Sequence, residues 1–148
     1  MVGVRFQRGN HMVADLDKAL TFYRDVLGFD VTYILPPNPD SYSYPVFAIP
    51  LEAVMRFCVL STEAQARVMA LTEVKNTPLP AVPHPRRSAI VLEIDDPDGV
   101  IAGARALGLN VYDEAVLRTN DGRFGREIGI VDFDDNLVVI YKIMGEAK

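Results

Sequence analysis

The stretch HMVADLDKALTFYRDVLGFDV, from His11 to Val31, carries the clearest structural pattern in the sequence. Asp15 is a residue type that caps the N-terminus of a helix. The apolar residues that follow recur at helical spacing, at Leu16, Ala19, Leu20, Tyr23, Val26 and Leu27. Gly28 stands where the end of a helix favours a left-handed residue. Residues 29–35 then alternate as a strand does, so the stretch predicts a strand, a helix and a second strand.

The residues on either side complete a first module. Residues 4–13 are predicted to form its first strand. After the Pro-rich loop PPNPDSYSYP, the segments VFAIP (46–50) and AVMRFCVLS (53–61) are predicted as two more strands. The expected order is β-α-β-β-β over about residues 4–60.

A second copy of this order covers about residues 88–143. Asp96 is an N-cap with Pro97 at the first helical position, and Gly108 ends the helix. Strands are predicted at 88–95, 109–117, 126–135 and 137–143. LGFDV in the first copy aligns with LGLNV in the second, about eighty residues later, which indicates an internal duplication.

The connection between the copies is about residues 61–87. TEAQARVMALTEV (62–74) is predicted as a helix, and NTPLPAVPHPRR (76–87) as a Pro-rich linker. The prediction for the chain is one α+β domain, residues 1–148, made of two modules.

Composition narrows the classes of function. The net charge of −5 argues against a nucleic acid partner, whose binding depends on clustered Lys and Arg. The single cysteine, Cys58, excludes an internal disulfide, and the N-terminal residues have no apolar signal-peptide region. No apolar run is long enough to span a membrane. These features predict a cytoplasmic protein.

Three stretches resemble the vicinal oxygen chelate superfamily, which includes glyoxalase I, bleomycin-resistance proteins and extradiol dioxygenases. They are VADLDKALTFYRDVLGF (13–29), LEIDDPDGVIAGARALGLNV (92–111) and VDFDDNLVVIY (131–141). The last is similar to the family's D-P-D-G-N turn, with Phe133 and Asp135 in place of Pro and Gly. The resemblance implies two modules side by side that form an open, cup-shaped mixed sheet, with helices on the convex side and a ligand in the concave side.

The resemblance also implies one divalent metal, held by four side chains that are usually His, Gln or Glu. Counting back seven residues from each helix cap gives Arg8 and Ala89, and three residues after Asn136 is Val139. The fourth position is expected at Arg56 by matching the modules. None of these four residues is a metal ligand, because arginine stays protonated and has no lone pair to offer. We therefore expect no metal and no other cofactor.

The two histidines do not replace this site. His11 lies four residues before Asp15, so strand alternation predicts that it faces the helix. His84 lies in the linker between prolines, without an obvious carboxylate neighbour.

Strand alternation predicts which residues line the cup. Arg8, Asn10 and Met12 are expected on one strand, and Arg56 with Cys58 on another. Two buried arginines require a counter-charge. Either a small organic anion or an internal ion pair, with Glu93 or another acid, would supply it. Cys58 is expected to be a packing residue rather than a nucleophile.

Aromatic residues and loops are the remaining candidates. Tyr42, Tyr44 and Phe47 either cover a planar ligand or pack at the rim. Loops 36–45 and 118–126 are candidates to close over the cup.

Three classes of function remain. The first is a metal-independent protein that binds a small organic anion through Arg8, Asn10, Arg56, Cys58 and Tyr44. The alternative is a lyase, isomerase or dioxygenase of the same superfamily. It would need an atypical metal site, or Glu93 as general base with Tyr141 as proton donor. The third is an interaction module whose cup is filled by its own side chains. The resemblance also implies a homodimer.

Overall fold

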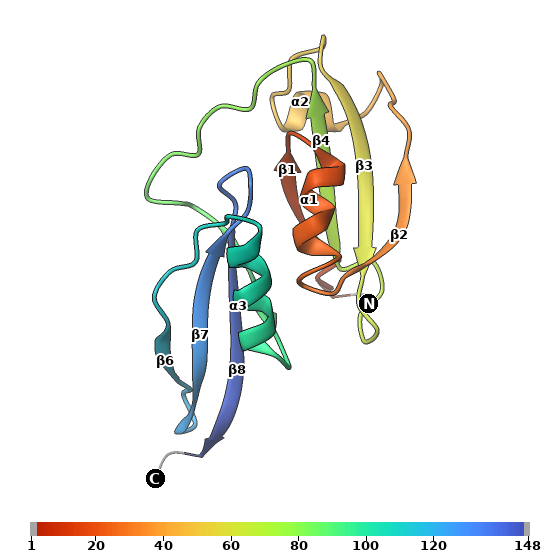
Figure 1. Cartoon of the computed structure of the whole chain (residues 1–148). Helices are drawn as coiled ribbons and strands as arrows, with labels where there is room; N and C mark the ends of the chain where they lie inside the picture. Colours follow the sequence, from red (N-terminus) through yellow and green to blue (C-terminus); the bar gives the residue numbers. More distant parts are fainter. Residues whose placement is uncertain (1–2, 147–148) are drawn as a thin grey trace. The chain divides into compact units, whose positions relative to one another are not determined.

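The computed structural model describes residues 3–146. The chain divides into two compact units, with the boundary between Pro80 and Ala81. Each unit contains one four-stranded mixed sheet with a helix against one face (Figure 1). No helix within the described residues is long and apolar enough to cross a membrane.

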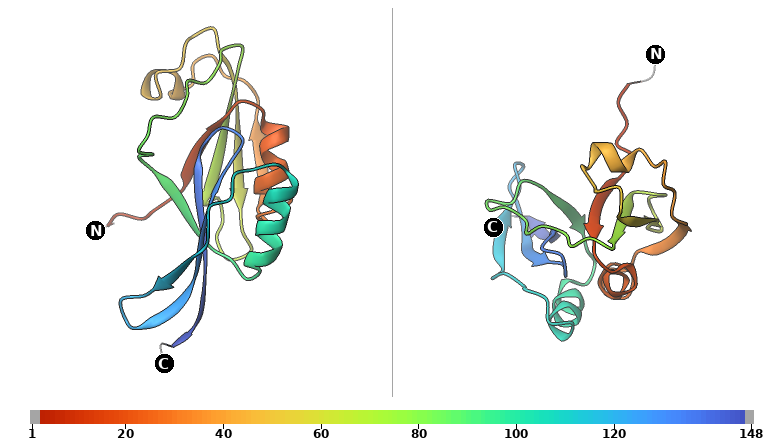
Figure 2. Two further views of the ribbon diagram at one scale, coloured as in Figure 1. Left: turned by 60° about the vertical axis from the view of Figure 1, so that its left-hand side comes forward. Right: turned by 90° about the horizontal axis from the view of Figure 1, so that it is seen from above.

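The first unit contains β1 (Gly9–Val13), α1 (Leu16–Tyr23), β2 (Asp30–Leu35), α2 (Ser43–Val46), β3 (Val54–Ser61) and β4 (Met69–Lys75). Its strand order is β1-β4-β3-β2, with β1 parallel to β4 and the other neighbours antiparallel. The helix α1 and the segment that contains α2 lie on opposite sides of this sheet (Figure 2).

The second unit repeats the arrangement. It contains β5 (Ala89–Glu93), α3 (Pro97–Ala106), β6 (Ala115–Arg118), β7 (Arg123–Val131) and β8 (Leu137–Glu146). The order β5-β8-β7-β6, with β5 parallel to β8, matches that of the first unit element for element. The predicted duplication and the α+β class are confirmed.

Both helices begin as predicted. The Asp15 carboxylate accepts a hydrogen bond from the Lys18 backbone N–H at 3.1 Å, and the Asp96 carboxylate accepts one from Gly99 at 3.1 Å. Each bond satisfies an N–H group that has no partner inside the helix. Gly108 follows the C-cap of α3 with a φ of +77°, the left-handed conformation that glycine adopts without strain. The first helix is shorter than predicted: α1 ends at Tyr23, residues 24–27 form a turn, and Gly28 follows that turn with a φ of +94°.

Two segments of the first unit differ from the prediction. The residues predicted as a strand at 46–50 instead begin with the last residue of the short helix α2, and Ala48 then turns the chain with a φ of +54°. The segment predicted as a helix at 62–74 is a turn followed by β4. Residues 69–74 are buried throughout because β4 is a central strand with both faces covered, and such strands lack the alternation that identifies exposed ones.

Two other predicted strands are shorter than expected. The first begins at Gly9 rather than at residue 4. In the second unit, the strand predicted at 109–117 begins at Ala115, preceded by a single bridge between Val111 and Ile130.

A buried carboxylate joins three elements of the first unit. Glu73 of β4, whose side chain is 3% exposed, accepts a hydrogen bond of 2.6 Å from the Leu16 backbone N–H at the start of α1. Arg56 of β3 donates to both of its oxygens, at 2.8 and 3.0 Å. Burial alone would raise the pKa of Glu73, but the Arg56 and Leu16 hydrogen bonds lower it overall.

We predict that Arg56→Met lowers the free energy of unfolding by about 3 kcal/mol, because it leaves a buried carboxylate without its ion partner. The matched control is Arg24→Met, which removes an exposed Arg24–Asp25 pair in the same unit and should lose less than about 1 kcal/mol. Urea denaturation at neutral pH measures both values. Equal losses in the two variants would contradict this assignment.

The same pair predicts a pH dependence. Because the folded pKa of Glu73 lies below its unfolded value, its stabilising contribution is present above the unfolded pKa and is lost as the pH falls through the folded pKa. The difference in stability between the native chain and Arg56→Met should therefore shrink in acid, where Glu73 is protonated in both proteins. Denaturation curves from neutral to acidic pH test this.

Candidate functional site

The face of the first sheet opposite α1 is a candidate binding surface. His11 of β1 lies on the helix side, where its Nδ1 is 2.7 Å from the Tyr23 hydroxyl of α1, as predicted for this residue. Strand alternation then places Asn10 and Met12 on the opposite face. Thr72 of β4 shares this face, and its hydroxyl donates to Asn10 Oδ1 at 3.0 Å.

Arg56 and Cys58 do not belong to this surface. Arg56 pairs with Glu73, which in turn binds the start of α1, so both lie on the helix side of the sheet. Cys58 has the same parity on β3 and is fully buried, and burial raises the pKa of its thiol to about 11. The prediction that these two residues share a face with Arg8 was wrong, because the alternation along β3 was assigned without its neighbour β4. For Arg56 the internal ion pair was the correct alternative.

Arg8 differs from Arg56, because it forms no ion pair within residues 3–146. It immediately precedes β1, and alternation places it on the face of Asn10. Its Nε is buried and has no hydrogen-bond partner among residues 3–146. A buried donor without an acceptor costs free energy, so Arg8 favours binding of an acceptor from outside the chain.

A pocket of about 230 Å³ opens on the same face of the first unit. Its walls are residues of β2, β3 and β4, the loop before α2 and the first residue of α2. The lining residues are Leu35, Pro36, Asn38, Ser41, Ser43, Met55, Phe57 and Thr72. This pocket was not predicted from the sequence, because Thr72 belongs to a segment that was predicted as a helix and forms part of β4 instead. A pocket is not expected of a pure interaction module whose surface is filled by its own side chains.

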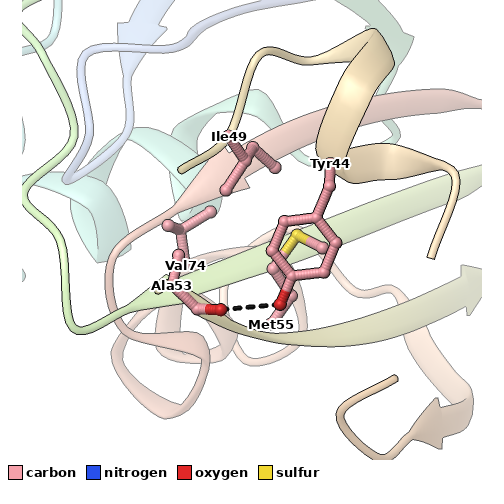
Figure 3. Close-up of a cluster of buried hydrophobic side chains, with 5 residues drawn as sticks. All are labelled: Tyr44, Ile49, Ala53, Met55 and Val74. Atoms are coloured by element: carbon pink, nitrogen blue, oxygen red, sulfur yellow. Dashed lines mark hydrogen bonds between the residues drawn. The ribbon is translucent and has the colours of Figure 1, made fainter. Parts of the chain in front are cut away.

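Tyr44 packs against Met55, which lines this pocket. It is 7% exposed and packs with Ile49, Ala53, Met55 and Val74 (Figure 3). Its hydroxyl donates to the Ala53 carbonyl at 2.6 Å, so the structure places Tyr44 in the packing role that was one of its two predicted roles. Tyr42 is 78% exposed.

In the second unit, Glu93 and Tyr141 are neighbours, as their predicted shared role requires. They are paired residues of β5 and β8, and the Tyr141 hydroxyl donates to Glu93 Oε2 at 3.1 Å. On the other side of β8, Glu127 is the residue of β7 that lies opposite Tyr141 in the antiparallel strand pair. The hydrogen bond to Glu93, helped by burial and by the negative charge, raises the pKa of Tyr141. The phenol therefore stays protonated at neutral pH and acts as a hydrogen-bond donor.

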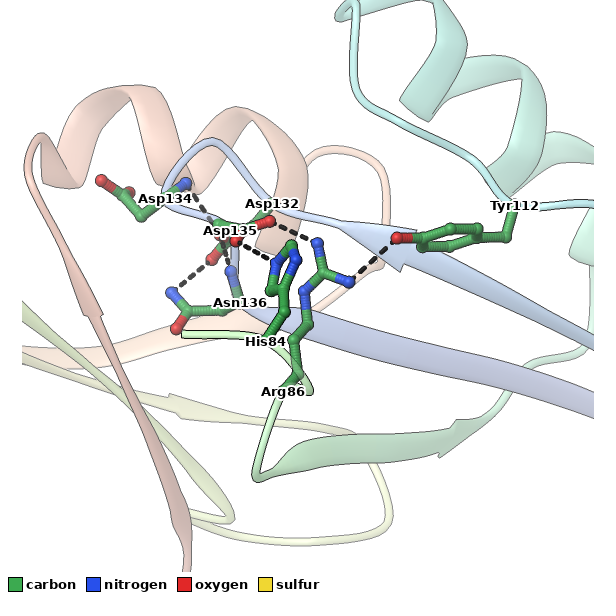
Figure 4. A network of polar contacts seen from close by, with 7 residues as sticks. All are labelled: His84, Arg86, Tyr112, Asp132, Asp134, Asp135 and Asn136. Carbon is green, nitrogen blue, oxygen red and sulfur yellow. Dashed lines mark hydrogen bonds and ion pairs between the residues drawn. The ribbon is translucent and has the colours of Figure 1, made fainter. Parts of the chain in front are cut away.

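A second polar network in this unit surrounds Asp135 (Figure 4). Asp135 accepts from Arg86 at 2.5 Å and lies 3.3 Å from His84 Nε2, and Arg86 also donates to the Tyr112 hydroxyl at 2.9 Å. The Arg86 guanidinium, followed by His84, lowers the pKa of Asp135. His84 thus has the carboxylate neighbour that was not expected, because the linker and the turn after β7 are far apart in sequence. Through these contacts, residues 84–86 are held against the turn between β7 and β8.

The strand pairing corrects which residues occupy the four positions where the resemblance implies metal ligands. The parallel ladders align Asn10 with Ala70 and Val91 with Val139, so the equivalent of Val139 in the first unit is Ala70 and not Arg56. The positions are then Arg8, Ala70, Ala89 and Val139. Alkyl and guanidinium groups offer no lone pair to a metal, so these residues do not fit the family's divalent ion. Within the described residues no group of three or more His, Cys, Asp or Glu side chains has the geometry to hold one elsewhere.

A scan against protein-family models matches residues 10–140 to the glyoxalase/bleomycin resistance protein/dioxygenase superfamily. The chain belongs to this superfamily. The match includes both units and confirms the family that the sequence resembles.

Solved structures agree on the fold. A glyoxalase family protein from Bacillus cereus aligns with a TM-score of 0.72 at 14% identity, covering 98% of this chain and 97% of that one. The fosfomycin resistance protein FosX from Listeria monocytogenes aligns with a TM-score of 0.60 at 17% identity, covering 96% and 93%. A glyoxylase/bleomycin resistance protein/dioxygenase domain from Frankia gives 0.66 at 13%, covering 97% and 93%. A search of the curated proteins finds no match.

We predict that Glu93→Gln lowers the pKa of Tyr141 toward that of a free phenol, because an amide neither carries the negative charge nor accepts as strongly. NMR titration of ¹³C-labelled tyrosine measures the shift, with Tyr141→Phe to assign the signal. Glu114→Gln is the matched control, since Glu114 pairs with Arg126 instead and should leave the titration unchanged. An unaltered curve in Glu93→Gln would contradict the hydrogen bond.

Proposed function

We propose that this protein binds a small organic anion on the sheet face opposite α1, with Arg8 as the charged donor and without a divalent metal. The observation that carries the proposal is the buried, unpartnered Nε of Arg8 at a position where the family's metal ligand would be. A guanidinium presents a planar set of donors that matches carboxylate, phosphate or phosphonate oxygens.

The chemistry of the neighbouring residues supports the same ligand class. Asn10 lies on the same face as Arg8, and its side-chain amide is held by the Thr72 hydroxyl. Its NH₂ group is oriented by that contact and provides a neutral donor near the guanidinium. Arg8 and Asn10 thus keep their predicted ligand-binding roles in the proposal, whereas Arg56, Cys58 and Tyr44 have structural roles and are left out of it.

One structural neighbour supports an anionic ligand by analogy. FosX has been solved with Mn(II) and sulfate, and a variant of it with Mn(II) and 1S,2S-dihydroxypropylphosphonic acid. Both oxyanions are of the class that a guanidinium binds. In our proposal the positive charge that accompanies the anion comes from Arg8 rather than from a metal.

The second candidate is an enzyme that uses acid–base chemistry. The hydrogen bond between Tyr141 and Glu93 favours it, because a protonated phenol beside a carboxylate is a donor and an acceptor in contact. In that case Glu93 would take a proton from the substrate and Tyr141 would stabilise the developing oxyanion. Loss of turnover in Glu93→Gln with unchanged ligand binding would identify this second function.

The expected homodimer and cytoplasmic location stay predictions.

The direct test is isothermal titration with sulfate, phosphate, methylphosphonate and propionate at low salt. We predict that at least one of these anions binds and that Arg8→Met weakens it tenfold or more, since a hydrogen bond to a charged group contributes about 1.5–3 kcal/mol. Arg5→Met is the matched control. Arg5 lies three residues earlier, is exposed and is bonded to Gln7, so its loss should leave binding unchanged.

Stability distinguishes a binding role from a structural one. If Arg8 serves a ligand, Arg8→Met should be at least as stable as the native chain without anion, because it removes a buried donor that has no partner. It should also lose the stabilisation that the bound anion provides. A large loss of stability without anion, or equal anion binding in Arg8→Met and the native chain, would contradict the proposal.

A further inference from the structure

The pocket of the first unit has a ligand chemistry of its own. We call it the loop pocket and define it by the eight lining residues given above, from Leu35 to Thr72. None of these residues carries a charge. The loop pocket is therefore a poor site for an anion, which would lose its hydration without gaining an ionic partner.

The apolar part of the loop pocket is formed by Phe57 and Met55. Both belong to β3 and face away from α1, since they alternate with Arg56. Met55 is 6% exposed and packs on Tyr44, so the short helix α2 fixes the position of its thioether (Figure 3). A flat apolar group would lie against the Phe57 ring and the Met55 side chain.

The polar part offers both donors and an acceptor. Thr72 is 2% exposed, and its hydroxyl proton is used in the bond to Asn10, so its oxygen remains available as an acceptor. Ser41 Oγ accepts from the Ser43 backbone N–H at 3.2 Å, which leaves its own proton to donate. Asn38 Oδ1 accepts from the Asp40 backbone, and its NH₂ group has no partner among residues 3–146.

We propose that the loop pocket binds an uncharged group that combines a flat apolar surface with an amide or hydroxyl. The carbonyl or hydroxyl oxygen accepts from Ser41 or Asn38, and the N–H or O–H donates to Thr72. This inference goes beyond the proposed anion site, because it uses neither Arg8 nor any charge. The volume of about 230 Å³ lies below the range of pockets for drug-sized ligands, so the pocket takes one ring or a short chain.

Benzamide and benzoate are suitable probes, since they have the same shape and differ in charge. Binding is followed by the ¹³C-methyl signal of Met55, assigned with Met55→Leu. We expect benzamide to shift this signal and to bind at least fivefold more tightly than benzoate, because the pocket has no cation to replace the lost hydration. Equal or tighter binding of benzoate would overturn the proposal, as would binding that leaves the Met55 signal unmoved.

Two variants test whether benzamide binds in the loop pocket. Ser43→Phe fills the pocket and should abolish benzamide binding. Val46→Phe is the matched control, because Val46 lies on the same short helix, is 53% exposed and does not line the pocket. Thermal melting checks that both variants fold. Retained benzamide binding in a folded Ser43→Phe would place the probe elsewhere and overturn the proposal.

A charge switch tests the inference without filling the pocket. Asn38 is an exposed lining residue, so Asn38→Lys should fold and should reverse the preference, with benzoate now tighter than benzamide. An unchanged preference would contradict the assignment. Arg8→Met should leave benzamide binding as it is, so failure of the anion site and failure of the loop pocket give different results.

Discussion

The carboxylate of Glu73 is the interaction on which the arrangement of the first unit depends. It accepts the first N–H of α1 and both Arg56 donors, and it is almost completely buried. A buried carboxylate is stable only when such partners surround it. Because Glu73 must face α1, its neighbour Thr72 must face the other way. The same alternation across β1 turns His11 toward Tyr23 and leaves Asn10 on the face of Thr72. The Glu73–Arg56 ion pair therefore marks the face that packs on α1, and the opposite face is the candidate binding surface.

That separation explains how two arginines in one unit have different roles. Arg56 is satisfied inside the protein, and its charge is balanced by Glu73. Arg8 has a buried Nε without a partner among residues 3–146, at a position where the resemblance to the superfamily implies a metal ligand. The resemblance to the superfamily implies a divalent metal, and with it positive charge, on this face. Here we infer that a guanidinium supplies that charge directly, while the loop pocket beside it offers neutral donors and an acceptor. A superfamily scaffold carries many chemistries in this way, because function depends on the few side chains that line one face.

Local signals were sufficient to predict much of the fold. The caps Asp15 and Asp96 mark the helix starts and Gly108 marks the end of α3, all through local contacts, and the repeated pattern revealed the two modules. The end of α1 was placed at Gly28, four residues too late, because the apolar spacing continues through the turn at 24–27. The strand β4 was missed because it is covered on both faces, so its residues show no alternation. That error displaced the fourth metal position to Arg56 and hid Glu73. Glu93 and Tyr141 were predicted on two recognised strands of the second unit, and the structure pairs these strands and brings the two side chains into contact. Asp135 and His84 were not connected, since their contact depends on a linker whose course no periodic pattern reveals.

We infer that the sheet face opposite α1, where the resemblance to the superfamily implies a metal, serves an anion in this protein. The first measurement is a titration of the purified, chelator-treated protein with Mn²⁺, Zn²⁺, Ni²⁺ and Fe²⁺, followed by elemental analysis after removal of free ion. Because Arg8, Ala70, Ala89 and Val139 each lack a lone pair for a metal, we predict no stoichiometric metal for any of the four ions. One tightly bound ion per chain, lost when residues on this face are substituted, would contradict it.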